Sequence, residues 1–475
     1  MVSCNDLQTL ASQAAKARNI HDIEFGGLSV ILAGDFAQLP PTGGPALYQG
    51  LVSLRVADAT TEYAQNSVLG RILWHQFTNV VILRQNMRQK GQTEADMKLR
   101  TALENMRYRS WTAQDIAFLR SRVASDRPGH PRLDTVKYRN VSVITALNIH
   151  KDAINNLGAK RFAQDTGQEL HEFFSIDRLS PRAVDKHKWK KCEQAHFSRV
   201  GPHLQHQLWN ATPSATAKHV PGCLQLCVGM PVMIKANDAT ELCITKGQEA
   251  VVKGWDDNVG PNGKRVLETL FVQLVKPPRP IQIDDLPLNV VPLPRASTHI
   301  TALLRDDTLV SLVRDQTMVL PNFSMTDYGA QGKSRNPNVV HLNNCRTHMA
   351  YCVALSRGHR AEETAIIQGF DENMIKGGLT GYMRQEFREL ELVDPSHWHP
   401  SIRGDHMDTF YVKYDDWRPT LPDKAEPSQS VLHVNGKRKA EEDVDVERPR
   451  KSAKSGGVHP KPAVASGTHT NDYHI

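Results

Sequence analysis

The chain has 475 residues, which corresponds to roughly three domains of ordinary size. It carries 58 Lys and Arg against 51 Asp and Glu, a formal net charge of +7, and its hydrophobic fraction is 40%. That fraction is too high for a wholly disordered protein, and no run of about 18 or more apolar residues predicts a membrane-spanning helix. The 7 cysteines do not form a disulfide framework, which favours a reducing compartment. The small basic excess permits nucleic acid as a partner but does not by itself indicate one.

Apolar runs and helical stripes alternate along most of the chain. Residues 28–33 (LSVILA) are almost continuously apolar, which is typical of a parallel strand buried on both faces. Residues 94–109 form a helical pattern with one apolar face made by Leu99, Ala102, Leu103 and Met106. Further strands are predicted at 141–147, 338–342 and 364–367, and a helix over 149–157. Strands that alternate with helices predict an α/β fold with a parallel, doubly wound sheet.

Two regions depart from this alternation. Residues 228–325 are rich in Val, Pro and Gly and contain short alternating segments such as 249–255, which predicts a small β structure inside the α/β frame. After about residue 420 the composition is polar and predicts a disordered tail. Two basic clusters in this tail, at 437–439 and 448–451, resemble a bipartite nuclear import signal and indicate the nucleus, with a solvated charge run as the alternative.

A carboxylate and an amide follow the first apolar run, in the string GDFAQLPP at residues 34–41. Ligands of parallel sheets bind at the carboxyl ends of the strands, so Asp35 and Gln38 are candidates for positioning a water or sensing a phosphate. The alternative is that Asp35 begins a turn and Gln38 caps it. On position alone, the turn is the favoured interpretation.

The whole string resembles motif III of the Pif-type superfamily 1 DNA helicases, including those carried by Helitron transposons. Further stretches are similar to other motifs of that family in the same order along the chain. They are residues 83–89 (LRQNMRQ, motif IV), 143–148 with Asn155 (the strand-to-helix segment), 326–332 (TDYGAQG, motif V) and 351–357 (YCVALSR, motif VI). Residues 228–233 and 244–248 resemble the entry to the family's small β-barrel insertion. The resemblance covers about residues 1–395.

This resemblance implies a RecA-like P-loop NTPase helicase core with a partial first domain and a complete second domain. It divides the chain into segments that we expect to be structural units. They are the end of the first RecA-like domain (1–82, motif III), the first part of the second (83–227, motif IV), a β-barrel-like insertion (228–325), the closing part of the second (326–395, motifs V and VI), an extension (396–420) and the tail (421–475).

The resemblance also implies an activity, namely 5′-to-3′ unwinding of DNA coupled to ATP hydrolysis. ATP and Mg²⁺ would be the cofactors, single-stranded DNA or DNA junctions the partners, and DNA repair, recombination or telomere maintenance the setting. Arg357 and Arg88 would act as arginine fingers, since a planar guanidinium pairs bidentately with phosphate oxygens. Gln38 would sense the γ-phosphate, and the residues that couple nucleotide state to DNA would be Asp35, Thr326, Gln331 and Gly332. The alternatives are a surface charge for Arg88 and a structural ion pair for Arg357.

The sequence departs from the family in two respects. Tyr328-Gly329-Ala330 stands where the family has His-Lys-Ser, so motif V lacks a cation and a hydroxyl. No G-x-x-x-x-G-K-[ST] string is present, because Gly332-Lys333-Ser334 has Asp327 in place of the first glycine. The family's metal-binding Asp-Glu pair is expected just before the string that Met1-Val2-Ser3 resembles. We therefore expect a helicase fragment that is inactive alone, or alternatively a non-enzymatic nucleic-acid-binding remnant of a transposon-derived helicase.

One basic segment interleaves cations with an aromatic ring, at Lys186, Lys188, Trp189, Lys190 and Lys191. These residues are DNA-binding candidates, because lysines can follow a phosphate backbone while a base stacks on the indole, and an exposed loop is the alternative. The nearby His187, Cys192, His196, His203 and His206 match no standard zinc spacing, so no metal site is predicted.

Overall fold

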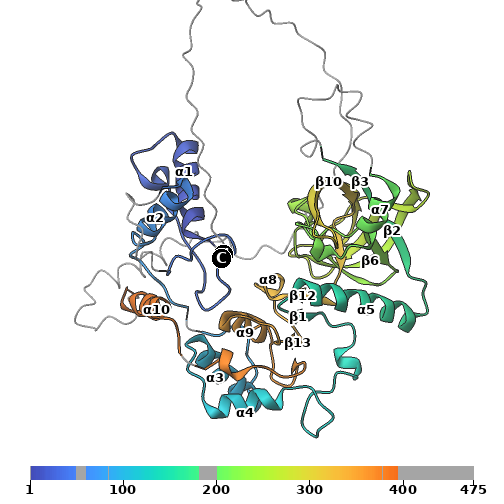
Figure 1. Cartoon of the computed structure of the whole chain (residues 1–475). Helices are drawn as coiled ribbons and strands as arrows, with labels where there is room; N and C mark the ends of the chain where they lie inside the picture. The colour runs from blue at the N-terminus through green and yellow to red at the C-terminus, as the bar shows by residue number, and fades with distance from the viewer. Residues whose placement is uncertain (1, 50–59, 84, 181–199, 377, 394–475) are drawn as a thin grey trace, which may run out of the picture. The chain divides into compact units, whose positions relative to one another are not determined.

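The computed structural model describes residues 2–49, 60–83, 85–180, 200–376 and 378–393 (Figure 1). The cluster at 186–191, the extension and the tail with both of its basic clusters lie outside the described residues. Within the described ranges, no helix is both long and apolar enough to cross a membrane.

A four-stranded parallel sheet lies at the centre of the α/β part of the chain. Its strands, in order across the sheet, are β12 (Ser324–Thr326), β1 (Val143–Thr145), β13 (Asn338–His341) and β14 (Thr364–Ile366). Val143 of the central β1 pairs with Ser324 on one side and with Val339 on the other. Most residues of these strands are buried, which explains the apolar runs that predict them. The predicted α/β fold with a parallel sheet is confirmed.

Helices flank this sheet: α3 (Glu94–Arg107), α4 (Ala113–Ser121), α5 (Asn148–Thr166) and α9 (His348–Leu355). The predicted helix at 94–109 is confirmed as α3, whose N-cap Thr93 accepts a hydrogen bond from the Asp96 backbone N–H. Helix α5 is longer than the predicted 149–157, because further buried residues continue its apolar face. It ends at Gly167, which takes the left-handed conformation (φ 64°) that glycine favours.

Helix α5 is fixed against the segment that enters β12. The Asn155 side-chain oxygen accepts backbone hydrogen bonds from Phe323 (2.9 Å) and Ser324 (2.8 Å). One turn further on, a Cβ at Gly158 would lie 2.4 Å from Cγ of Phe323, so only glycine allows this close approach. These contacts position the end of β12, where Thr326 begins motif V.

The β structure forms three antiparallel sheets. The five-stranded sheet has the order β11 (Val319–Pro321), β5 (Pro231–Ile234), β6 (Glu249–Val259), β7 (Arg265–Leu274) and β8 (Val290–Pro294). The others are β3 (Ile176–Leu179), β10 (Leu309–Gln316) and β9 (Ala296–Leu303), and the pair β2 (His171–Phe174) and β4 (Cys223–Leu226). The β pairing thus starts at His171, ahead of residue 228 where we expect the insertion to begin. The domain boundaries themselves stay a prediction.

The N-terminal part contains α1 (Cys4–Arg18) and α2 (Glu62–Trp74), whose buried residues include Cys4, Leu7 and Leu73. The prediction of a buried strand at 28–33 is wrong, because these residues form no strand. Val30 and Leu32 pack against the α1–α2 core, whereas Ile31 is 93% exposed. The physical reason is that no described segment pairs with these residues, so their backbone lacks the ladder of hydrogen bonds that defines a strand. The remaining helices are α7 (Pro202–Asn210), α8 (Asp327–Ala330) and α10 (Gly381–Val393).

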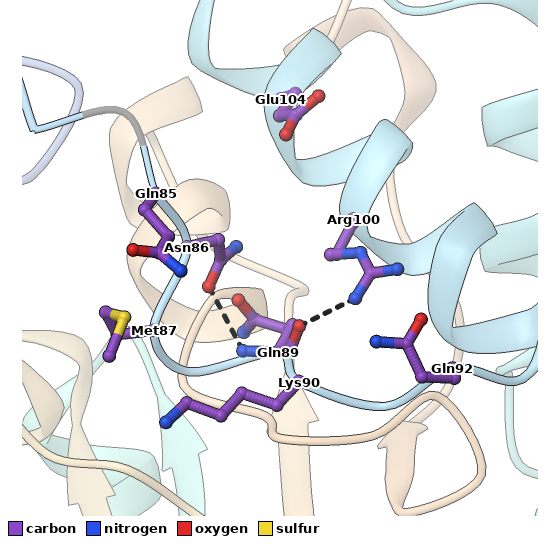
Figure 2. A pocket seen from close by; sticks show the side chains of 8 residues that line it. All are labelled: Gln85, Asn86, Met87, Gln89, Lys90, Gln92, Arg100 and Glu104. Carbon is purple, nitrogen blue, oxygen red and sulfur yellow. Dashed lines mark hydrogen bonds between the residues drawn. The ribbon is translucent and has the colours of Figure 1, made fainter.

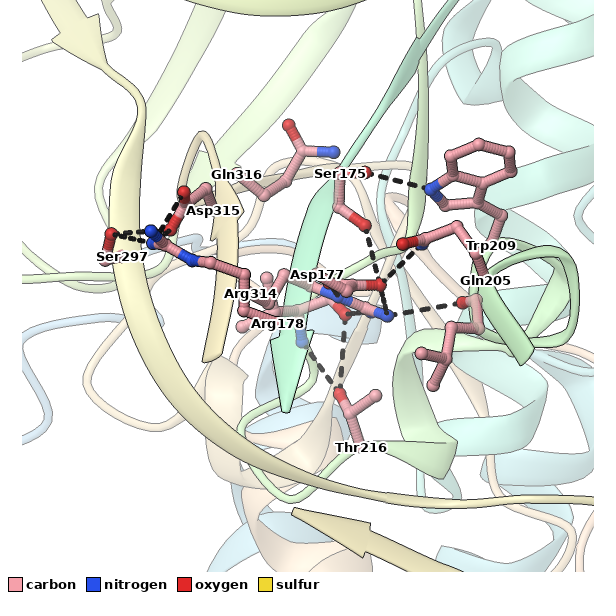
Figure 3. Close-up of polar contacts among 12 residues, drawn as sticks. Ser175, Asp177, Arg178, Gln205, Trp209, Thr216, Ser297, Arg314, Asp315 and Gln316 are labelled. Atoms are coloured by element: carbon pink, nitrogen blue, oxygen red, sulfur yellow. Dashed lines mark hydrogen bonds and ion pairs between the residues drawn. The ribbon is translucent and has the colours of Figure 1, made fainter. Parts of the chain in front are cut away.

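A fully buried ion pair holds β3, β10 and the α7 region together (Figure 3). The guanidinium of Arg314 on β10 donates to both carboxylate oxygens of Asp177 on β3, at 2.8 and 2.9 Å. The remaining donors bind the carbonyls of Val220 and Leu208, and Asp177 also accepts hydrogen bonds from Ser175 and Gln205. Because every charge is paired, the network satisfies the requirement that buried polar groups have partners.

We predict that Arg314→Ala destabilises the β part strongly, by about 3–5 kcal/mol, because it leaves the Asp177 carboxylate buried without a partner. The matched control is Arg178→Ala, which breaks the neighbouring β3–β10 ion pair with Asp315, where the Arg178 side chain is 50% exposed. That change should cost at most about 1 kcal/mol. Chemical denaturation measures both, and equal losses would contradict the importance given to the buried pair.

Candidate functional site

Arg357 follows α9 directly and lies inside the α/β part, with only 3% of its surface exposed. Helix α9 is apolar along its whole length, and the hydroxyl of its N-cap Thr347 accepts a hydrogen bond from the Ala350 backbone N–H. The Arg357 Nε donates to the Val353 carbonyl at 2.9 Å, and Nη2 donates to the Ser356 hydroxyl at 2.7 Å. Nη1 is 3.5 Å from the Lys333 carbonyl. The guanidinium is thus fixed by neutral oxygen atoms.

No carboxylate in the described part of the chain forms an ion pair with Arg357, in contrast to the buried Arg314. Burial, together with the nearby charge of Arg88, lowers the pKa of Arg357 to about 10, although Asp35 partly opposes the shift. A pKa of about 10 still leaves the group charged at neutral pH. Arg357 is therefore a buried cation without a counter-ion, and the alternative of a structural ion pair does not hold among the described residues.

Arg88 approaches the same point from the motif IV loop. Its Nη1 donates to the Ser356 carbonyl and its Nε to the Ser334 hydroxyl, each at 2.9 Å. Burial lowers the pKa of Arg88 as well. Since Arg357 donates to the hydroxyl of Ser356 and Arg88 to its carbonyl, the two guanidinium groups meet at one residue. Arg88 is thus held by Ser334, which follows motif V, and by Ser356 of motif VI, rather than lying free on the surface.

The neighbouring Gln89 is buried and fastens the loop to motif VI. Its side-chain amide donates to the carbonyls of Ser356 and Gly358. Figure 2 shows the loop beside a pocket of about 530 Å³ lined by Gln85, Asn86, Met87, Gln89, Lys90, Gln92, Arg100 and Glu104. Several of these polar groups hold the loop itself: the Asn86 side chain accepts from the Gln89 backbone N–H, and Arg100 donates to the Gln89 carbonyl. Sequence reasoning missed Gln89, although it is part of the motif IV string.

Asp35 begins a turn, as one of the two sequence interpretations has it. Its Oδ1 accepts from the Ala37 backbone N–H at 2.9 Å, and its backbone carbonyl accepts from the Gln38 N–H at 3.1 Å. Its Oδ2 accepts from Arg107 Nη1 at 2.7 Å. Burial alone would lower the pKa of Arg107, but the Asp35 carboxylate outweighs it and the pKa is raised. Both carboxylate oxygens of Asp35 are therefore already engaged.

Motif III contacts motif V directly. The Gln331 side-chain nitrogen donates to the Gln38 side-chain oxygen at 3.1 Å, and the Tyr328 hydroxyl donates to the Pro40 carbonyl at 3.3 Å. Thr326 caps the single turn of α8 by accepting from the Gly329 N–H, and Gly332 has φ 81° with open space around it. The structure thus brings Gln38 and Gln331 together, with Thr326 and Gly332 at the two ends of the same segment.

The carboxylate of Glu249, which the sequence did not reveal as a site residue, binds the two cations that follow motif V. Oε1 of Glu249, at the start of β6, accepts from Lys333 Nζ at 3.0 Å and from Arg335 Nη1 at 2.7 Å. Burial raises the pKa of Glu249, but the two cations outweigh it and the pKa is lowered. The Arg335 backbone N–H in turn donates to the Arg357 carbonyl at 2.8 Å. The β part is therefore bound to the backbone that carries Arg357.

Two sequence interpretations concern groups elsewhere. The candidate DNA-binding residues Lys186, Lys188, Trp189, Lys190 and Lys191 lie outside the described residues. Within the described ranges, no three His, Cys, Asp or Glu side chains are grouped so that they could hold a metal ion.

The solved structures that resemble this arrangement are Pif1 helicases. Pif1 helicase from Candida albicans has a TM-score of 0.51 at 17% sequence identity, covering 82% of this chain and 74% of that one. Bacteroides Pif1 bound to single-stranded DNA has a TM-score of 0.50 at 17% identity, with coverages of 82% and 72%. Pif1 from Bacteroides in complex with ADP-AlF3 and single-stranded DNA has a TM-score of 0.50 at 16% identity, covering 83% of this chain and 74% of that one. The fold is that of the Pif1 helicases. No protein-family model matches the sequence, and no curated protein matches it.

The Pif1-like fold confirms the expected RecA-like architecture, while the Helitron subgroup stays a prediction. The roles of individual residues rest on their geometry, because a resemblance at this level of identity concerns the fold.

We predict that Gln89→Ala frees the motif IV loop, because two hydrogen bonds to motif VI are lost. Backbone amides at 86–91 should exchange with deuterium about tenfold faster, the effect expected when one or two net hydrogen bonds are removed. Gln92→Ala, an exposed amide in the same loop, is the control and should change little. Unchanged exchange in Gln89→Ala would show that the loop is held by other contacts.

Proposed function

We propose that the chain carries the second motor domain and part of the first domain of a Pif1-type, ATP-dependent DNA helicase of superfamily 1. The observation that carries this proposal is the meeting of Arg357 and Arg88 at Ser356, one of them buried without a carboxylate partner. A site of this kind needs an anion, since a buried charge without a partner is costly.

The chemistry of phosphoryl transfer suits these two arginines. Charge on the γ-phosphoryl oxygens is stabilised in the transition state by fixed cations, and arginine does this with a planar fork that matches phosphate. Arg357 donates to oxygen atoms of Val353, Ser356 and Lys333, and these contacts fix its orientation before a ligand binds. Such preorganisation is the main contribution that a protein makes to this reaction.

The contact between Gln38 and Gln331 supports a route from the nucleotide to DNA. Gln38 lies in motif III and Gln331 in motif V, so a ligand that draws either amide to itself would break or re-form the bond between them. We propose single-stranded DNA, and more finely DNA junctions, as the partner, since two similar Pif1 structures hold single-stranded DNA. Thr326, Gly332 and the basic segment at 186–191 are the candidate contacts.

The described residues supply no fitting Mg²⁺ ligand at this site. Asp35 is the carboxylate that influences Arg357, and its oxygens already bind Arg107 and the Ala37 N–H. No step of the proposal is therefore assigned to a metal. The 475 residues also contain no P-loop string, so we expect ATP hydrolysis to require a polypeptide that supplies one.

A second candidate is a non-enzymatic nucleic-acid-binding protein. It is favoured by Tyr328-Gly329-Ala330 in motif V, which offers DNA no cation. The Tyr328 hydroxyl donates to the Pro40 carbonyl instead. Under this alternative, Arg357 would have no role in nucleotide turnover. We propose the nucleus as the location in either case, on the basic clusters of the tail.

We predict that, when the chain is joined to a P-loop domain, Arg357→Lys lowers ATP turnover by at least about tenfold, because lysine keeps the charge but loses the fork. Nucleotide affinity should fall much less, since the effect concerns the transition state. Steady-state ATPase and a nucleotide titration on the same protein test this, with Arg346→Lys, an exposed arginine near motif VI, as control. Affinity that collapses together with turnover would make Arg357 a ground-state or folding residue.

We further predict that the 475-residue chain binds single-stranded DNA through backbone phosphates without hydrolysing ATP. With about three phosphate contacts, affinity should fall by about tenfold or more between about 50 and 200 mM salt, because counter-ions are released on binding. Fluorescence anisotropy of a labelled oligonucleotide measures this. Binding that is independent of salt, or absent at low salt, would contradict the prediction.

A further inference from the structure

A second pocket, of about 560 Å³, also borders the motif IV loop. Its lining comes from four separate parts of the chain: the loop itself, the segment that follows β7, the segment before β13, and the residues after motif VI. The lining residues are Met87, Arg88, Lys90, Gly91, Lys276, Asn336, His359 and Arg360.

The charges of this pocket are all of one sign. Arg88, Lys90, Lys276 and Arg360 are cations, and none of the eight lining residues is acidic. Arg360 pairs with Glu362 at 3.7 Å, but both side chains are more than half exposed, so this pair neutralises little. Lys90 and Lys276 form no ion pair with any described residue. Positive charge therefore gathers at Arg88, Lys90 and Lys276, whereas Arg360 lies near the carboxylates of Glu362 and Asp96.

The first pocket, shown in Figure 2, makes a useful contrast. It contains the acidic Glu104, and the donors of Arg100 and Gln89 are spent on carbonyl groups of the protein. In the second pocket, Arg88 uses Nε and Nη1 on Ser334 and Ser356, which leaves Nη2 without a partner in the described part of the chain. The second pocket thus combines Nη2 of Arg88 and Lys276 with Lys90, which lines both pockets.

We propose that this pocket binds phosphate groups, as an anion site that shares Arg88 with the site at Arg357 and extends from it to Lys90 and Lys276. The choice of ligand rests on the proposed function. Phosphate fits because its tetrahedral oxygens accept donors from several directions, and here a guanidinium and two ammonium groups come from different parts of the chain. The ligand is either the polyphosphate tail of a nucleotide or the backbone of a nucleic acid, which share this chemistry. Since Lys276 belongs to the β part and Lys90 to the motif IV loop, a bound phosphate links the two.

The test removes the two lysines that no protein carboxylate neutralises, in the variant Lys90→Gln/Lys276→Gln of the full chain. Two probes are titrated at constant ionic strength: inorganic tripolyphosphate by calorimetry, and a labelled oligothymidylate by fluorescence anisotropy. The control is Lys253→Gln, which removes an exposed lysine of β6 in the same sheet as β7. The substituted lysines are exposed, so the variants are expected to fold.

We expect the double variant to bind at least one probe about tenfold more weakly than the control, the effect expected when two charge-assisted contacts are lost. Weakening of tripolyphosphate points to a nucleotide tail, and weakening of the oligonucleotide alone points to a nucleic-acid backbone. Affinities within about twofold of the control for both probes would overturn the proposal. The same titrations on Arg357→Lys separate this proposal from the proposed function. If Arg357→Lys loses affinity for a probe and the lysine variant does not, the anion binds at Arg357 and the second site does not exist.

Discussion

A buried guanidinium with no carboxylate partner among the described residues is the constraint around which the site is arranged. Arg357 donates hydrogen bonds to a backbone carbonyl of α9 and to the Ser356 hydroxyl, with the Lys333 carbonyl nearby. These neutral acceptors orient the cation but do not neutralise it. Arg88 binds the same serine and so increases the local positive charge. This concentration of charge is unfavourable for folding and favourable for binding an anion.

The β part contributes to this site from a distance along the chain. Glu249 neutralises Lys333 and Arg335, the two cations that follow motif V, whereas Arg357 and Arg88 form no ion pair with a described carboxylate. The position of Glu249 depends on the β sheets, whose own packing includes the buried pair of Arg314 and Asp177. Movement of the β part would therefore change the balance of charge beside Arg357, which connects this part physically to the chemistry proposed for the motor domain.

Part of this arrangement could be predicted from the sequence, and part could not. The helix at 94–107 follows from its apolar face, and the strands at 143–145, 338–341 and 364–366 follow from runs that are apolar because both faces of the sheet are covered. The run at 28–33 has the same composition but forms no strand, since pairing depends on a neighbour that composition does not report. Likewise, no local pattern reveals Glu249, whose partners lie more than 80 residues away. Arg357 itself is indicated by motif VI, but its lack of a carboxylate partner is a property of the folded chain.

The most direct test of this account compares the thermal stability of two arginine-to-methionine variants of the full chain without ligand. Arg335 is paired with Glu249 and Arg357 has no such partner, although both side chains are largely buried. We predict that Arg335→Met unfolds at a lower temperature than the wild type, because Glu249 loses a neutralising cation. Arg357→Met should unfold at or above the wild-type temperature, because an uncompensated charge is removed. If Arg357→Met instead melts several degrees below the wild type, as Arg335→Met should, then Arg357 is a structural residue and the central claim is wrong.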